Sequence, residues 1–328
     1  MIIDGFAGPG GWSEGLRILS LRDVGLEFDT SACQTRAAAG HLTVQCDVAQ
    51  YPTAPFNGKS RGQIWSPPCQ AWTRTGNRHG IADQPLVHQA VHDLAHGRDT
   101  RAELLAQCQD KRSLLAAEPM RWLHDLRPEW VCMEEVPDVL ALWRQYAQHL
   151  QAWGYSTWTG ILDAADYGVP QNRQRALLIA SRERRITGPD KTHARQPAFD
   201  LFDTCADRWL SIGQTLGWAG PRVVVSNYGD PTTASGRGER TADEPCWTIT
   251  SKLSRIKIVD PRDGNVTRLS THQAGVIQSF PADYPWRGSK TEQDQQVGNA
   301  VPPLLAAHIV SAATGIPMPA AHTDAAAA

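Results

Sequence analysis

The sequence predicts an α/β protein with a mostly parallel, doubly wound sheet and a second, smaller domain that is mainly β. The first half alternates short apolar runs with helical patterns, which is the order of βαβ units. A glycine-rich turn, "AGPGG" at 7–11, separates the first apolar run from the first helical pattern. Beyond Arg182, short β-like runs alternate with Gly, Pro and Asp. At 328 residues, the length fits about two domains.

The strands of the larger sheet are predicted from apolar runs that end at polar or special residues. These runs are 1–6, 23–29, 42–48, 62–68, 130–135 and 176–181. A helix is predicted over 12–19 with Ser13 as its cap, and one or two helices over 85–126 on the flank of the sheet. Ligands of open α/β sheets bind outside the carboxyl ends of the strands. We therefore expect Asp4 to Gly11, Glu27, Asp47, Cys69 and Glu134 to converge on one crevice.

The second domain is predicted from the change of pattern after the larger sheet. Residues 182–197 are basic and rich in turn formers, and β-like runs follow at 221–229, 246–251 and 255–260. A helix begins near 298, with Pro302 and Pro303 in its first turn and Gly315 beyond its end. The predicted domains are therefore 1–185 together with 290–328, and 186–289.

Composition sets limits on location and partners. The seven cysteines show no CxxC spacing, no metal-ligand cluster and no secreted-type framework, which indicates a reducing compartment. No run approaches the 18 apolar residues of a membrane span, and no leader precedes "MIIDGF". We expect a cytoplasmic protein without metal or membrane contact. Because 26 of the 32 basic residues are arginine, we interpret the source as a GC-rich prokaryote or its virus.

The formal net charge of −2 provides no attraction of the whole protein for nucleic acid. Such a partner would require a local basic face. Residues 171–195 supply one, with an excess of five positive charges. Its charged members are Arg173, Arg175, Arg182, Arg184, Arg185, Lys191 and Arg195 against Glu183 and Asp190. A solvated charged segment is the alternative interpretation.

The glycine turn lets a backbone approach a ligand closely, because glycine has no side chain to intervene. A dinucleotide fingerprint would place a third glycine at position 13, where the chain has Ser13. A nucleoside cofactor without a pyrophosphate fits better, with Glu27 at the end of the second strand to bind ribose hydroxyls. An ordinary structural turn remains the alternative.

Cys69 is the strongest candidate nucleophile. It follows two prolines that fix the backbone, in "SPPCQAWTRTG" at 66–76. The other six cysteines are expected to be small buried hydrophobes. Glu134 ends an apolar strand, where an acid is costly without a function or an ion-pair partner, and Arg175 is the expected partner. The alternatives are a solvated strand end for Glu134 and a surface position for the arginines.

Five motifs in order carry a family resemblance: "FAGPGG", "PPCQ", "MEEV", "QNRQR" and "GNAVPP". Together they resemble the DNA (cytosine-5) methyltransferase family from residue 3 to about 313, and 268–284 is similar to its penultimate motif. Two features depart from the family pattern. Glu135 occupies the position of an asparagine that normally steadies the loop, and the segment between Cys69 and Glu134 is longer than usual.

The resemblance implies a Rossmann-like fold that uses S-adenosylmethionine, and a target-recognition domain. It assigns Cys69 as the thiolate that adds to carbon 6 of a cytosine flipped out of double-stranded DNA. Glu134 would bind ring nitrogen 3 and the 4-amino group. Arg175 would hold the base oxygen and orient Glu134, and Arg173 is counted in the same catalytic set. The protein is expected to be a monomer.

The resemblance also implies cofactor and DNA contacts. Phe28 would cover the adenine face, although a core position is its alternative, and Asp47 would bind the adenine amino group. The full cofactor set is Phe6, Gly8, Gly10, Gly11, Glu27, Phe28, Asp47, Val48, Pro67, Asn299 and Val301. A polar loop over 70–84 is expected to close on the DNA. The DNA contacts are Gln70, Arg74, Arg78, His79, Arg182, Arg184 and Arg185.

Three other functions are compatible with parts of this pattern. One is a cytosine-5 methyltransferase of tRNA, because related RNA-modifying enzymes keep the same cysteine. The second is an enzyme acting on a free nucleotide, against which the basic stretch and the second domain argue. The third is a catalytically silent DNA-binding regulator. Retention of Cys69, Glu134 and Arg175 argues against it, and Glu135 argues slightly for it.

Overall fold

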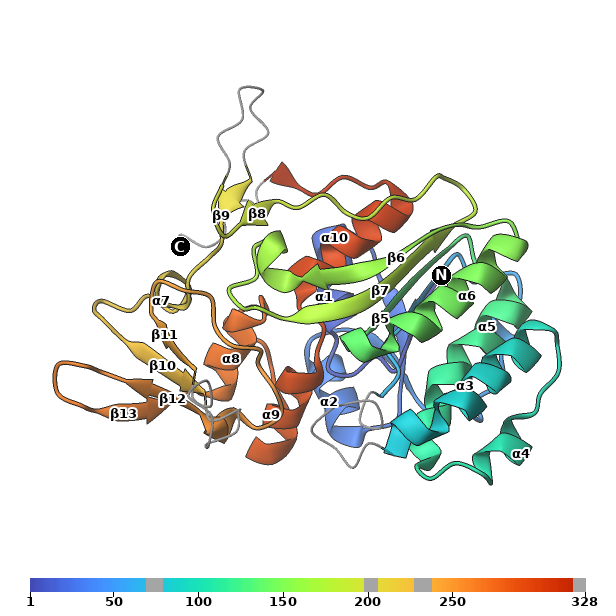
Figure 1. Ribbon diagram of the computed structural model, residues 1–328, viewed down its shortest axis with the longest axis horizontal. Coiled ribbons are helices and arrows are strands. Elements are labelled where there is room, and N and C mark those ends of the chain that lie inside the picture. Colours follow the sequence, from blue (N-terminus) through green and yellow to red (C-terminus); the bar gives the residue numbers. More distant parts are fainter. Residues whose placement is uncertain (69–78, 198–205, 227–237, 321–328) are drawn as a thin grey trace.

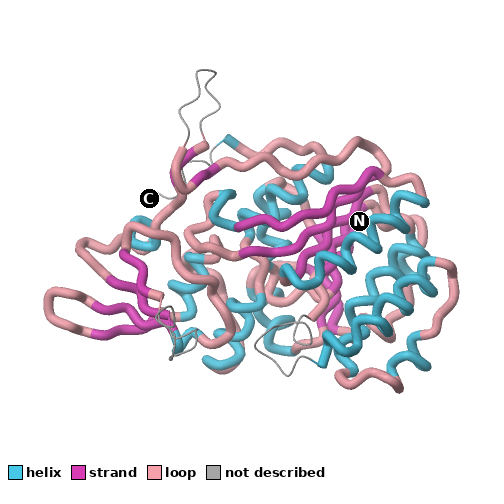
Figure 2. Tube along the Cα trace, viewed as in Figure 1, coloured by secondary structure: helices cyan, strands magenta, loops and turns pink. Residues whose placement is uncertain are grey.

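The structure is a computed structural model that describes residues 1–68, 79–197, 206–226 and 238–320 (Figure 1). A larger α/β part and a smaller, mainly β part lie side by side, and the return of the chain at its end joins them (Figure 2). The described part confirms the predicted α/β class.

Seven strands form the large sheet, in the order β3-β2-β1-β4-β5-β7-β6. Five parallel strands come first, namely β1 (Ile2–Gly5), β2 (Asp23–Glu27), β3 (Leu42–Gln45), β4 (Gly62–Trp65) and β5 (Trp130–Glu135). Strand β7 (Gln174–Ser181) is antiparallel to both β5 and β6 (Ser156–Asp163). The prediction missed β6. Because β7 is reversed, its first residues lie at the edge where β5 ends.

Helices cover both faces of this sheet, as expected of a doubly wound fold. On one face, α1 (Gly11–Ile18) and α10 (Pro303–Thr314) pack over Ile64, Cys132 and Leu177. On the other face, α3 (His79–Ala95), α5 (Glu118–Leu126) and α6 (Leu140–Ala152) pack over Trp65, Val131 and Met133. The two sets of strand residues alternate along the chain, because successive side chains of a strand point to opposite faces.

The remaining elements of the larger part are short. They are α2 (Thr30–Ala38), α4 (Arg101–Leu105) and the 3-10 turns η1 (Ala54–Phe56), η2 (Lys111–Ala117), η3 (Pro137–Val139) and η4 (Ala164–Tyr167). The segment 85–126 therefore holds more than the one or two helices predicted. The predicted cap of α1 was also wrong. Gly10 is the N-cap, and Ser13 lies inside the helix, where its hydroxyl donates to Asp23 over 2.9 Å.

A four-stranded antiparallel sheet forms the smaller part, in the order β11-β10-β12-β13. Its strands are β10 (Val223–Ser226), β11 (Glu239–Thr241), β12 (Ile256–Val259) and β13 (Val266–Arg268). Around it lie β8 (His193–Ala194), β9 (Asp207–Arg208), α7 (Ile212–Thr215), η5 (Leu253–Arg255), α8 (Thr271–Ile277) and α9 (Lys290–Asn299). The strand predicted over 246–251 is absent, since only Cys246 forms a single bridge, with Gln171.

A third core fills the space between the small sheet and two helices. It joins Val224, Ile258 and Ile277 with Val297 and Ala300. Helix α9 was predicted to belong to the larger domain, yet its Val297 packs in this core. The domain boundaries remain a prediction, and the packing favours one that follows α9.

One helical stretch of the described residues, Lys290–Thr314, is long and apolar enough to cross a membrane by composition alone. In this fold 67% of its most apolar window is buried. Leu305, Ile309 and Val310 of α10 pack with Trp12 and Leu16 of α1. The burial of α10 inside the protein therefore accounts for its apolar sequence.

Candidate active site

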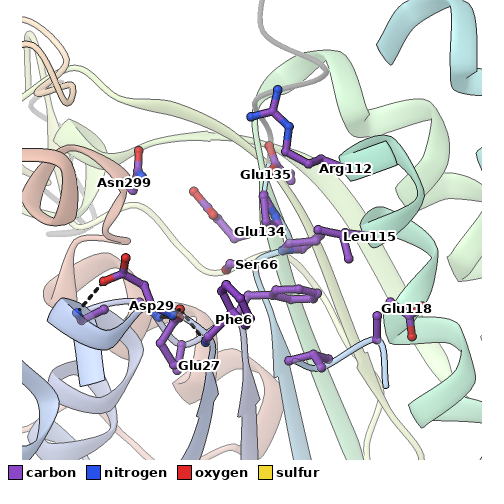
Figure 3. A pocket seen from close by; sticks show the side chains of 18 of the residues that line it. Phe6, Glu27, Asp29, Ser66, Arg112, Leu115, Glu118, Glu134, Glu135 and Asn299 are labelled. Atoms are coloured by element: carbon purple, nitrogen blue, oxygen red, sulfur yellow. Dashed lines mark hydrogen bonds between the residues drawn. The ribbon is translucent and has the colours of Figure 1, made fainter. Parts of the chain in front are cut away.

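A cavity of about 1000 Å³ opens at the carboxyl ends of the five parallel strands (Figure 3). Its lining includes residues 6–9, 27–29, 47–50, 66–68 and 134–136, which follow or end β1 to β5 in turn. The end of α9 and its connection to α10 complete the lining with Gly298, Asn299 and Val301. Of the described residues predicted to converge, Phe6 to Pro9, Gly11, Glu27, Asp47 and Glu134 line this cavity, whereas Asp4, Gly5 and Gly10 do not. This volume is at the upper end of ordinary ligand cavities.

The three glycines of the turn have different surroundings. Gly8 has a φ of 53°, and apart from its chain neighbours no atom of the described residues lies within 4 Å of the position that a Cβ would take. A Cβ on Gly11 would lie 2.1 Å from the carbonyl oxygen of Val301. Gly10 has a φ of 106° and, alone among the predicted cofactor residues, does not line the cavity. Gly8 therefore leaves room for a ligand, whereas Gly11 makes room for the returning chain.

Glu27 fastens the glycine turn to the end of β2. One carboxylate oxygen accepts the N–H of Gly8 over 2.7 Å. The other accepts the N–H groups of Phe28 and Asp29 over 2.8 and 2.7 Å. A carboxylate has about four acceptor positions. One position is therefore left on the half-buried Glu27 for a donor in the cavity, such as a hydroxyl group.

An exposed aromatic ring lies beside that carboxylate. Phe28 lines the cavity and is 74% exposed, so the alternative of a core position was wrong. Asp47, on the neighbouring strand connection, accepts from the N–H of Ala49 and the Nε2 of Gln50, each over 3.0 Å. An apolar ring and two carboxylates in the lining of one cavity suit a flat heterocycle joined to a sugar.

Glu134 is a buried acid held by one cation. It is 6% exposed, and its Oε1 lies 2.8 Å from Nε of Arg175. Neither carboxylate oxygen accepts a hydrogen bond from the described residues, and Oε1 is buried without one. Arg175 thus balances the charge, and the described part of the chain donates no hydrogen bond to this carboxylate on the cavity wall (Figure 3 shows Glu134 there). A buried polar atom without a partner is costly, so a ligand that donates to Glu134 would relieve that cost.

The two neighbouring arginines have different tasks. Arg175 donates from Nη1 to the carbonyl of Gln174 over 2.7 Å, while its Nε forms the ion pair with Glu134. Arg173 is 2% exposed, and it donates to the carbonyls of Ile249 and Gly298 over 2.9 and 3.1 Å. The surface alternative was therefore wrong for both. Arg173 links the start of β7 to two distant segments of the cavity wall.

Glu135 is a second buried acid beside Glu134. It is 5% exposed and accepts a short hydrogen bond from its neighbour's N–H, that of Val136. Burial, and next the charge of Glu134, raise the pKa of Glu135 well above its usual value. The alternative of a solvated strand end was wrong, because both acids are buried.

The wall opposite the glycine turn comes from the long segment whose role the sequence left open. Arg101, Arg112, Leu115 and Glu118 line the cavity there (Figure 3). Arg101 donates to Glu118 over 2.5 Å. Burial raises the pKa of Glu118 above its usual value. The sequence signal was weak, because these side chains come from short turns without a recognisable spacing.

A second cavity, of about 830 Å³, lies between the smaller part and the edge of the large sheet at which β6 ends and β7 begins. Arg175 lines both cavities. Arg195 and Arg208 are exposed and form no ion pair with the described residues. Arg240 lies over the ring of Trp247, 3.8 Å from its centre. Four arginines and three carboxylates line this space, together with Asn172, Gln174, Gln196, Trp209, Pro245, Trp247 and Thr248.

The predicted DNA contacts are not all in this region. Gln70, Arg74 and Arg78 lie outside the described residues. His79 begins α3, and 79–84 are helical rather than part of a loop. Residues 182–185 follow the end of β7, where Ser181 pairs with Trp130 at the start of β5.

Arg182, Arg184 and Arg185 are therefore about 25 Å from the cavities, the length of an eight-residue strand. Arg182 donates to the carbonyls of Arg127 and Pro128 at that far edge. The structure does not bring these three residues to the site.

Cys69 lies outside the described residues, although Pro67 and Pro68 before it line the cavity. Cys205 is also outside. Burial raises the thiol pKa of all five described cysteines, for example to about 11 in Cys33 and Cys46. Cys132 and Cys246 are fully buried, as predicted, whereas Cys33, Cys46 and Cys108 are only half-buried. None of the five is activated as a nucleophile.

The fold and the cavity define a Rossmann-like, S-adenosylmethionine-dependent methyltransferase. The family model for C-5 cytosine-specific DNA methylases matches residues 104–215 and 224–314, more than half of the chain. The protein belongs to that family. It methylates cytosine in DNA at carbon 5 with S-adenosylmethionine as the methyl donor.

Curated relatives and solved structures agree with this assignment. The Type II methyltransferase M.HgiDI of Herpetosiphon aurantiacus is 27% identical, over 93% of this chain and 91% of its own. M.AplI of Arthrospira platensis is 26% identical, over 93% and 83%. The crystal structure of S. pombe Dnmt2 methyltransferase has the same fold, with a TM-score of 0.64 at 15% identity over 96% of this chain and 98% of its own.

The described residues fit S-adenosylmethionine. Gly8 leaves an open space, Glu27 keeps one acceptor position, and Phe28 presents a bare ring. Predicted cofactor residues other than Gly10 line one cavity. Among the described residues no three His, Cys, Asp or Glu side chains are grouped to hold a metal ion.

Proposed function

We propose that the enzyme works through a transient bond between Cys69 and carbon 6 of a cytosine flipped out of double-stranded DNA, with Glu134 and Arg175 holding the base. The main support is Glu134, a buried carboxylate on a cavity wall that, within the described part of the chain, contacts one cation and accepts no hydrogen bond. Pro67 and Pro68 line the same cavity immediately before Cys69.

In this mechanism the thiolate of Cys69 adds to carbon 6, and the ring electrons shift toward carbon 5. Glu134 accepts a hydrogen bond from the 4-amino group and, carrying a proton on its other oxygen when the base is bound, donates to ring nitrogen 3, which becomes more basic as sulfur adds and takes up that proton. Arg175 holds Glu134 by its Nε and is free to turn a second N–H toward the base oxygen. Loss of the carbon 5 proton to a base then breaks the sulfur–carbon bond and restores Cys69.

Phe28 would cover the adenine, Glu27 would bind a ribose hydroxyl, and Asp47 would bind the adenine amino group. Phe6, Val48, Pro67, Asn299 and Val301 would complete the enclosure, and Gly8 and Gly11 would shape it. When bound, S-adenosylmethionine supplies an electrophilic methyl group to carbon 5. The protein's part is to exclude water and keep that group facing the base.

The DNA would lie over the second cavity. This position is supported by the exposed Arg195 and Arg208, and by Arg175, which borders both cavities. Trp209 offers a flat ring there. The smaller domain would provide sequence recognition, because base edges are contacted by a few side chains.

The biological setting we propose is the cytoplasm of a prokaryote, where the enzyme acts as a monomer on chromosomal or phage DNA without a metal ion. The bacterial Type II methyltransferases among its relatives support a role in restriction-modification.

The test uses duplex DNA and methyl-labelled S-adenosylmethionine. We expect label to enter duplex DNA, and Cys69→Ala to lose transfer while it still binds the cofactor. Duplexes with 5-fluorocytosine at the target should form a stable covalent adduct with the wild type, since the fluorine cannot leave as a proton does. Absence of any adduct, or full activity of Cys69→Ala, would refute the assignment of Cys69.

A further inference from the structure

We infer that Glu135 is a neutral carboxylic acid in the folded enzyme and serves as a positioning residue for Glu134. This inference deepens the proposed function and rests on it for the role of Glu134. It concerns the position where this chain departs from its family, with an acid in place of the usual asparagine.

The first observation is a shortage of positive charge. Glu134 and Glu135 end β5, are 6% and 5% exposed, and both line the cavity. Among the described residues Arg175 is the only cation within 4.0 Å of either carboxylate, and it contacts Glu134. Among the described residues one guanidinium thus contacts this pair of adjacent buried carboxyl groups, and it does so at Glu134, so the cost of ionising both is high.

The surrounding charges do not remove this shortage. Arg173 contacts backbone carbonyls of Ile249 and Gly298, and Arg112 is paired with Asp110 at 2.7 Å. Glu118 is paired with Arg101 and Arg121. The titratable and charged side chains that line the cavity are Glu27, Asp29, Asp47, Asp99, Arg101, Lys111, Arg112, Glu118, Glu134, Arg173, Arg175 and Glu292.

The second observation is the hydrogen bond of Glu135. Its Oε2 accepts the N–H of Val136, the next residue, at the point where β5 ends. A neutral acid can accept this N–H with its carbonyl oxygen and keep an O–H donor on the other oxygen. This combination of one acceptor and one donor is that of an amide. A protonated Glu135 thus offers the chemistry of the asparagine that it replaces.

Ionisation of Glu135 would weaken the hold on Glu134. A second carboxylate beside the pair would compete for Arg175, and it would repel the charge of Glu134. Burial, followed by the neighbouring Glu134, raises the pKa of Glu135 by more than the hydrogen bond from Val136 and the charges of Arg175 and Arg173 lower it. The protonated form therefore persists to a higher pH than in an ordinary glutamate side chain.

The sign of the pH effect follows from proton linkage. In the unfolded chain Glu135 ionises near its ordinary pKa of about 4.3, whereas in the folded protein it keeps its proton to a higher pH. Between these two pKa values the folded state binds more protons, so rising pH lowers the stability of the wild type. Glu135→Gln removes this effect because its amide does not titrate.

The experiment compares wild type, Glu135→Gln and Glu135→Ala over a pH series from about 5 to 9. We expect the thermal midpoint of Glu135→Gln to exceed that of the wild type by a gap that widens as pH rises. In single-turnover methylation, the wild type should lose about tenfold in rate per pH unit above the pKa of Glu135. Glu135→Gln should lack this alkaline loss, and Glu135→Ala should be slower at every pH.

Parallel stability curves of the wild type and Glu135→Gln, or an inactive Glu135→Gln with a native fold, would overturn the inference. If the variants fail to fold, infrared spectroscopy of the wild type still tests the inference. The wild type near neutral pH should show the C=O band of a protonated acid, and its absence also overturns the inference. If no protein methylates DNA but the stability gap is present, the proposed function fails and the neutral state of Glu135 stands.

Discussion

Nε of Arg175 lies 2.8 Å from Oε1 of Glu134, and this contact joins the first residues of β7 to the last residues of β5. It depends on strand direction. Because β7 is antiparallel to β5, Ala176 pairs with Glu135 and Ser181 pairs with Trp130. The first residues of β7, Arg175 among them, are thereby brought to the catalytic edge, and the residues after β7 are carried to the opposite edge.

Removal of Arg175 should destabilise the protein through Glu134. Arg175→Met leaves a buried carboxylate without a cation, for which we expect a loss of about 3–5 kcal/mol in the free energy of unfolding. Adding Glu134→Gln should restore much of this loss, because the second change removes the uncompensated charge. Urea denaturation of both variants measures the effect. A double variant no more stable than Arg175→Met would show that the two side chains are not coupled.

Phe28 provides a test of cofactor binding that is separate from folding. Since the ring is 74% exposed, Phe28→Ala should change the unfolding free energy by less than about 0.5 kcal/mol. Loss of one aromatic contact should weaken S-adenosylmethionine binding by about 2- to 10-fold. Titration calorimetry gives this value, with Ile161→Ala, 46% exposed on β6, as the matched control. Equal affinities of the two variants would place the adenine elsewhere.

The sequence predicted the part of the cavity that is formed by strand ends. Glu27, Asp47 and Glu134 end or follow apolar runs, and parallel strands bring such ends together whatever the details of packing. The DNA contacts of Arg182, Arg184 and Arg185 stay a prediction. These residues follow a strand whose apolar pattern does not reveal its direction, and its reversal carries them to the edge away from the cavities.

Contacts between distant segments were beyond the sequence pattern. The position of Arg173 depends on two carbonyls, of Ile249 and Gly298, that only the folded chain brings near. Helix α9 likewise packs in the third core through Val297, although its sequence is mostly polar. The hydrophobic periodicity and composition of a segment describe that segment alone. The positions of Arg173 and α9 are instead determined by tertiary contacts with other elements.

The glycine turn allows a matched pair of substitutions. Gly11→Ala would place a methyl group 2.1 Å from the carbonyl oxygen of Val301. The backbone must shift, so we expect a large loss of thermal stability. At Gly8 the positive φ of 53° costs about 1 kcal/mol for alanine, but the methyl group enters open space. Gly8→Ala should fold and bind S-adenosylmethionine more weakly.

Thermal denaturation with and without S-adenosylmethionine separates the two glycines. The cofactor should raise the midpoint of Gly8→Ala less than that of the wild type, because stabilisation by a ligand follows its affinity. If the shift with cofactor equals that of the wild type, the ligand does not occupy the space beside Gly8.

The second cavity can be tested as the DNA-binding face by charge reversal. Arg195 and Arg208 are exposed in its lining, while Arg185 is equally exposed at the far edge of the sheet. Each phosphate contact contributes a slope of about −0.9 to the dependence of log affinity on log salt concentration for duplex DNA. Arg195→Glu and Arg208→Glu should each weaken duplex binding and reduce that slope by about 1, with unchanged affinity for S-adenosylmethionine.

Arg185→Glu should bind like the wild type. Fluorescence anisotropy across a salt series measures affinity and slope together, and a larger loss in Arg185→Glu than in the other two would move the DNA to the opposite edge.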